Sequence, residues 1–88
     1  MDTITQIEVT TITNTIVGIL ANDRPDWEVI TNTFIFESTE QAKKFASKHI
    51  NRHSTVIVTD VTDERDEVLF NSKRFDKISD AKKALKEI

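Results

Sequence analysis

The chain contains no cysteine, and it has only one glycine and one proline among its 88 residues. The absence of cysteine excludes disulfides, thiolate metal sites and cysteine nucleophiles. The single glycine excludes the glycine-rich loops in which backbone amides bind phosphates. Because glycine and proline are so rare, no flexible linker divides the chain. We therefore expect one domain that spans residues 1–88.

Long apolar runs and a basic leader are also missing. No segment approaches the ~20 apolar residues that cross a bilayer, and residues 1–6 include an acid where a signal peptide needs basic side chains. These absences predict a cytoplasmic protein with no membrane partner. The apolar fraction of 38% and the charged fraction of 31% are ordinary for a folded globular chain.

Catalytic signatures are absent as well. The sequence has no Gly-x-Ser-x-Gly elbow, no evident arrangement of serine with histidine and aspartate, and no feature that selects one carboxylate pair among its many acids. A domain of this size also has little volume for a concave site. We therefore predict that the protein is not an enzyme, has no catalytic residues and needs no cofactor.

Two groups of residues could in principle bind metal ions. His49 and His53 are four positions apart, the spacing of a histidine pair on a helix, but no third ligand is evident and residue 53 falls beyond the expected helix end. The acidic segment 60–67 offers carboxylates without the spacing or the glycine of an EF-hand loop. We predict a charged hairpin loop and no metal site, and cation binding by this loop stays an open alternative.

An internal repeat is the main organising feature. Phe36 and Phe75 are 39 positions apart. At that offset an acid directly follows each Phe, an Ala-Lys-Lys triplet lies further along both segments, and the alignment needs no gap. The match predicts a tandem pseudo-repeat over residues 15–50 and 54–88. Convergence of two amphipathic strand-strand-helix stretches on similar residues is the alternative explanation.

Local patterns place the elements within each half. Segments rich in β-branched residues predict four strands that form two hairpins, over residues 15–21, 27–36, 54–61 and 67–75. Helices should follow each hairpin, the first capped by Ser38 and the second by Asp76 or Ser79. The Thr-rich segment 3–13 predicts either a further strand or a long first strand.

The resulting fold class is α+β. We expect a single antiparallel sheet of four or five strands with two helices packed on one face, in the order (β)ββαββα. Compact repeats of this kind occur in bacterial and phage proteins, which favours such an origin and indicates nothing about activity.

The second strand is apolar on both sides. Period-two alternation places Ile30, Phe34 and Phe36 toward the helices and leaves a second row facing outward, which makes that row the candidate interface: Trp27, Val29 and Ile35. An exposed patch of this kind favours a protein partner, although coverage by a neighbouring strand would explain the same pattern.

Basic residues concentrate in the second half, although the net charge is −3. The candidate nucleic-acid contacts are Lys73, Arg74, Lys77, Lys82, Lys83 and Lys86. The strand-helix pattern of residues 4–50 resembles the small three-stranded domains at the start of phage-type integrases, which implies a sheet that reads DNA. The strands here carry Thr, Asn and Glu instead of Arg and Lys, so the resemblance carries no binding residue over.

The sequence thus favours a small non-enzymatic interaction protein that forms a homodimer or other homo-oligomer. Association would use the uncovered sheet face or a Thr-rich edge strand formed by residues 3–13. The alternative is a nucleic-acid-binding accessory or regulatory module that uses the basic second half. The residues do not specify the partner.

Overall fold

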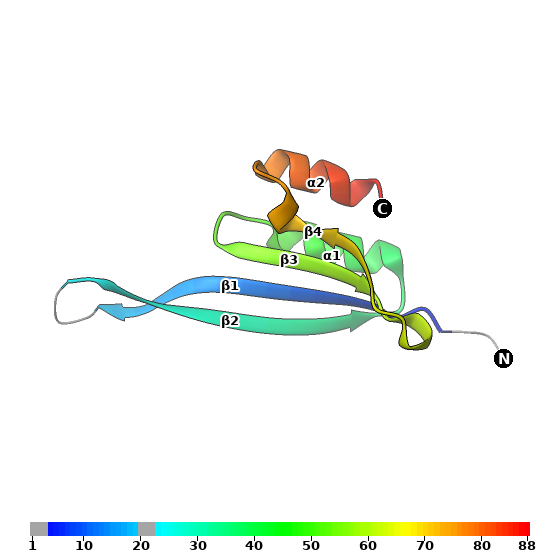
Figure 1. The fold of residues 1–88 in the computed structure, drawn as a ribbon, viewed down its shortest axis with the longest axis horizontal. Coiled ribbons are helices and arrows are strands. Elements are labelled where there is room, and N and C mark those ends of the chain that lie inside the picture. The colour runs from blue at the N-terminus through cyan, green and yellow to red at the C-terminus, as the bar shows by residue number, and fades with distance from the viewer. Residues whose placement is uncertain (1–3, 20–22) are drawn as a thin grey trace.

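The computed structural model describes residues 4–19 and 23–88, apart from the side chain of Val17. In chain order its elements are β1 (Ile7–Ile19), β2 (Pro25–Phe36), α1 (Thr39–His49), β3 (Ser54–Asp60), η1 (Thr62–Glu64), β4 (Glu67–Asn71), η2 (Ser72–Arg74) and α2 (Ile78–Lys86). The strands form one antiparallel sheet, and the helices form a second layer beside it (Figure 1). The predicted α+β class is confirmed.

The four strands lie in the order β2-β1-β3-β4. Residues 7–13 of the Thr-rich amino-terminal segment are therefore part of one long first strand, whereas Thr3 lies outside the described residues. The prediction that this segment forms an edge is wrong, because β1 pairs with β2 on one side and with β3 on the other. The edges of the sheet are β2 and β4.

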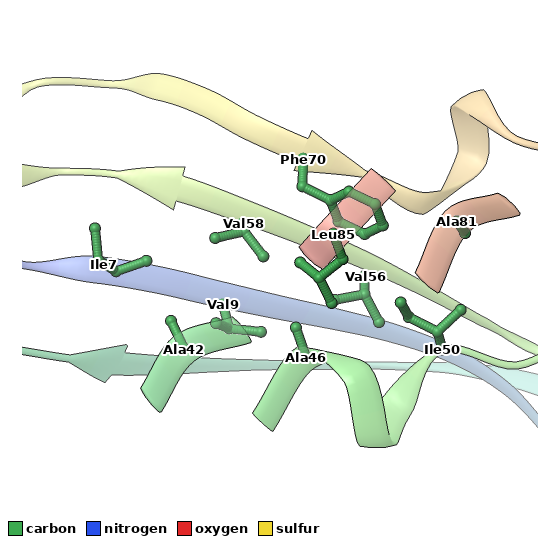
Figure 2. Close-up of a cluster of buried hydrophobic side chains, with 10 residues drawn as sticks. All are labelled: Ile7, Val9, Ala42, Ala46, Ile50, Val56, Val58, Phe70, Ala81 and Leu85. Atoms are coloured by element: carbon green, nitrogen blue, oxygen red, sulfur yellow. The ribbon is translucent and has the colours of Figure 1, made fainter. Parts of the chain in front are cut away.

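One face of the sheet holds the core. Ile7 and Val9 of β1 are opposite Asp60 and Val58 of β3, and Val58 is in turn opposite Phe70 of β4. Both helices contribute to this one cluster (Figure 2), whose buried members are Ile7, Val9, Ala42, Ala46, Ile50, Val56, Val58, Phe70, Ala81 and Leu85. Small alanines on the helices let them approach the valines of the sheet closely.

The helix signals are only partly confirmed. Ser38 caps α1 as predicted, since its side chain accepts a hydrogen bond from Gln41 N. The cap prediction for α2 is wrong: its N-cap is Lys77, without a side-chain hydrogen bond. Strand β4 also ends earlier than predicted, at Asn71, because the Asn71 side chain accepts a hydrogen bond from Lys73 N and starts the turn η2.

The predicted tandem repeat is not confirmed. The offset of 39 aligns residues 15–19 with 54–58, but these segments have different roles in the sheet. Residues 54–58 pair with the part of β1 that carries core residues, whereas residues 15–19 pair with β2 alone. The apolar row at Ile7 and Val9, which the offset leaves unmatched, is the row that meets the helices.

The first hairpin makes the molecule long. Its principal extents are 59 × 26 × 17 Å, and its radius of gyration is 15.4 Å, whereas a compact domain of this length has a radius of roughly 12 Å. The excess comes from the distal part of the β1–β2 hairpin, which projects beyond the helices and β3 (Figure 1). We call residues 14–19 and 25–29 the arm.

We predict that Val58→Ala destabilises the fold by about 2–3 kcal/mol, because Val58 is fully buried and the substitution removes two methyl groups and leaves a cavity. Val68→Ala is the matched control on the neighbouring strand, where the side chain is 45% exposed, and it should cost less than about 0.5 kcal/mol. Urea unfolding followed by circular dichroism measures both values. Equal costs would contradict the one-sided core.

Candidate interaction surface

The sheet face opposite the helices has no described layer over it. The odd-numbered residues of β2 lie on this face, because they pair with the even-numbered residues of β1, while Ile7 and Val9 point into the core. This arrangement places Trp27, Val29 and Ile35 on the uncovered side, as their alternation predicts. Whether they form an interface stays a prediction.

These side chains are about half exposed. Ile16 is opposite Trp27 in the register and extends the row, and the exposed fractions are 53% for Ile16, 51% for Trp27, 60% for Val29 and 55% for Ile35. Glu8 is the one charged residue among the paired residues of β1, β2 and β3 on this face. The other polar members are chiefly threonines, so an uncharged surface of β-branched side chains runs along the sheet.

The arm is exposed on both faces. Ile16 and Trp27 are exposed on the uncovered side, and Glu28 is exposed on the helix side. Within the described residues, the ring of His53 contributes the one aromatic contact to the arm, at 6.2 Å between its centroid and that of Trp27. A two-stranded ribbon is marginally stable alone in water. The arm is therefore the part of the sheet that would gain most from a partner.

The helix layer carries the basic residues. Lys73 and Arg74 lie in η2, Lys77 caps α2, and Lys82, Lys83 and Lys86 lie on α2 itself. A groove of about 530 Å³ runs between the two helices, lined by Glu40, Gln41, Lys43, Lys44, Ser47, Lys82, Leu85 and Lys86. Lys43 crosses between the helices, since its Nζ donates hydrogen bonds to the main-chain oxygens of Lys86 and Ile88.

The candidate nucleic-acid contacts predicted from the sequence leave out the basic residues of α1. The charges differ between the layers of the structure more than between the halves of the chain. Residues 39–53 and 72–88 carry ten basic and four acidic side chains, and the remaining residues carry two basic and eleven acidic ones. A sorting of the charges by predicted helix and strand would have shown this difference.

The two predicted metal-site alternatives gain no support from the geometry. His49 lies against Phe45 of α1, with ring centroids 4.4 Å apart, whereas His53 stacks on Trp27, so the two imidazoles have different neighbours. Across residues 4–19 and 23–88, no group of three or more histidine, aspartate or glutamate side chains could hold a metal ion.

The acidic loop 60–67 is shaped by its own hydrogen bonds. Asp63 and Glu64 adopt positive φ angles of 53° and 64°, which turn the chain sharply after β3. The Asp60 side chain accepts a hydrogen bond from Thr62 N at 3.0 Å. Thr62 Oγ1 accepts one from Gln6 N at 2.9 Å, so the loop is tied to the start of β1.

This network lowers the pKa of Asp60 below its ordinary value of 3.8. The main cause is the hydrogen bond from the Thr62 backbone, followed by that from the Thr62 side chain; desolvation opposes them, and the nearby charge of Arg65 adds the smallest lowering effect. The two hydrogen bonds and the Arg65 charge favour the carboxylate over the carboxylic acid, whereas desolvation favours the acid. The structural role of Asp60 is therefore to hold the loop, which is a use of the carboxylate that needs no cation.

Comparison of the chain with protein-family models, with curated proteins and with solved structures finds no match. Function is therefore inferred from the surfaces of this chain. In the part of the chain that the structure describes, neither helix has the length and apolar character needed to cross a membrane.

We predict that Asp60→Asn flattens the acid dependence of stability. A depressed folded-state pKa contributes stability that is present above pH 3.8 and is lost as the pH falls through the lower folded value. Asparagine can still accept the hydrogen bond from Thr62 N but does not titrate. Urea midpoints of the variant should therefore differ less between neutral pH and about pH 3 than those of the parent protein.

Asp66→Asn, at an exposed position of the same loop, removes the same charge and is the control for that experiment. It should leave the acid dependence of the parent protein unchanged. An Asp60→Asn profile that overlays the parent profile would show that the Thr62 hydrogen bonds do not stabilise the carboxylate in solution.

Proposed function

We propose that this chain is a non-enzymatic interaction module that associates with copies of itself through the uncovered sheet face and the arm. One observation supports the proposal most directly: four large apolar side chains, each about half exposed, lie in one row on a face with a single charged residue. Contiguous exposed apolar patches on protein surfaces often mark interaction sites.

The energetics of the arm favour the same function. The ribbon of the arm presents Ile16, Trp27 and Val29 on the uncovered face, and it loses little backbone freedom when it binds, because its strands are already paired. Burial of a half-exposed Val or Ile side chain contributes about 1 kcal/mol, and a two-fold interface buries each side chain twice. The contributions of the individual side chains, each counted in both copies, thus offset part of the translational and rotational freedom lost on association.

We predict that the protein self-associates reversibly and that Val29→Ser raises the dissociation constant about thirtyfold, because the substitution removes apolar burial from both copies. Ile4→Ser is the matched control: Ile4 is 64% exposed and lies outside the strands. Sedimentation velocity over a wide concentration series measures the constants. A strict monomer at high concentration, or equal effects of the two substitutions, would refute self-association through this surface.

We propose nucleic-acid binding by the helix layer as a second candidate function. The observation that favours it is the separation of charge: ten basic side chains against four acidic ones in residues 39–53 and 72–88 of a protein whose net charge is −3. The groove between α1 and α2, with lysines on both walls, would follow a phosphate backbone by charge without reading its bases.

We predict that the double variant Lys82→Gln, Lys86→Gln weakens binding to a labelled DNA duplex at low salt. The slope of log affinity against log salt concentration should decrease by roughly 0.9 for each phosphate that the variant no longer neutralises. Arg65→Gln, which removes a basic charge from the acidic loop, is the control and should change little. The absence of any complex at low salt, or an equal effect of Arg65→Gln, would exclude this function.

A further inference from the structure

The outer edge of β2 is the most specific feature of the interaction surface, and we propose that a second copy of the chain pairs with it. In this pairing two β2 strands run antiparallel about a two-fold axis with Thr31 opposite the partner's Thr31. Two four-stranded sheets would then join into one sheet of eight strands. The inference rests on the self-association proposed above and places its contact at the β2 edge, where the side chains of Trp27, Val29 and Ile35 on the uncovered face meet side chains of the partner's β2.

The hydrogen-bonding pattern identifies which residues of β2 face the edge. Asn14 N donates to His53 O, and Val61 N donates to Gln6 O, so the even-numbered residues of β1 direct their main-chain groups toward β3. The odd-numbered residues of β1 therefore face β2, where they are opposite even-numbered residues. By the same alternation, odd-numbered residues of β2 point their N–H and C=O groups outward: 27, 29, 31, 33 and 35.

This edge lacks the features that usually block pairing. Charges, prolines and bulges protect edge strands, and β2 has these only near its start, where Pro25, Asp26 and Glu28 lie close to the bulge at Ile16/Gly18. Residues 29–36 contain no charge and no proline, and their register is continuous. The opposite edge is protected, because β4 has only five residues, begins at Glu67 and is paired across a bulge.

The register follows from the length of β2 and from its side chains. Centring on Thr31 uses all five outward-facing residues, pairing Trp27 with the partner's Ile35 and Val29 with the partner's Thr33. Aromatic–β-branched, β-branched and Thr–Thr pairs are favourable across strands. Centring on Asn32 instead would place Trp27 opposite the partner's Glu37, which lies outside β2.

The same register would support the arm of each copy. Residues 26–30 of one β2 would lie beside residues 32–36 of the other, and Phe34 and Phe36 in that stretch pack against Phe45 of α1. Each arm would thus lie beside the part of the partner's β2 that packs against α1. This strand alone would support the arm. Both uncovered faces would lie on the same side of the joined sheet.

The cysteine-free sequence allows a direct test. Single variants Thr31→Cys, Asn32→Cys and Thr33→Cys are oxidised at a concentration at which the parent associates, and disulfide-linked dimers are quantified. In the proposed register the Cα atoms at position 31 are about 5.5 Å apart, whereas those at position 33 are separated by four residues, or about 14 Å, along the strands. Disulfides need Cα atoms within about 7 Å. Cross-linking at Thr31 should exceed that at the other two positions at least fivefold.

A charge placed on the edge or in the middle of the face separates this inference from the broader proposal. Thr33→Lys should abolish the dimer in sedimentation, because it places an ammonium group at the paired edge, whereas Thr55→Lys on central strand β3 should not. Preferential cross-linking at Asn32 or Thr33, or a dimer abolished only by Thr55→Lys, would overturn the β2 pairing while self-association stands. A parent protein that is monomeric throughout would overturn both.

Discussion

The pairing of β1 with β3 is the contact on which the rest of the structure depends. Its register brings Val9 opposite Val58 and so gathers the buried residues of two hairpins on one side of the sheet. Two short helices cover that side across all four strands, from Phe70 of β4 to Phe34 and Phe36 of β2, but only over part of the length of the first hairpin. The arm, the outer edge of β2 and most of the second face lie beyond their reach, and these are the surfaces on which the proposed self-association rests.

Local order was predictable from the sequence because local rules determine it. Alternation along β2 correctly assigned Phe34 and Phe36 to the helix side and Trp27 to the other, and the Ser38 cap follows from the preference of helix N-termini for hydroxyl side chains. Strand order was not predictable, because a Thr–Ile alternation such as that of β1 suits a central strand and an edge strand equally well. The choice depends on long-range apolar contacts, here those of Ile7 and Val9.

The candidate site shows the same division. The exposed row on β2 could be predicted from the two-residue period of a strand. Its position at the edge of the sheet could not, because that depends on the order of all four strands. The basic groove combines Lys43 and Lys44 from one helix with Lys82 and Lys86 from the other, and their proximity depends on how the helices pack. The protein thus presents two chemically distinct surfaces, a sheet face on which Glu8 is the one charged residue among the paired residues of β1, β2 and β3, and a cationic helix layer.

The stacking of Trp27 on His53 has a practical consequence. The only indole of the chain lies on the arm, far from the buried valines and with an imidazole 6.2 Å away. Its fluorescence will therefore report detachment of the ribbon end, while the amide signal of the helices reports loss of the core. Non-coincident transitions from these two probes would reflect where the fluorophore lies, and they would not by themselves indicate a folding intermediate.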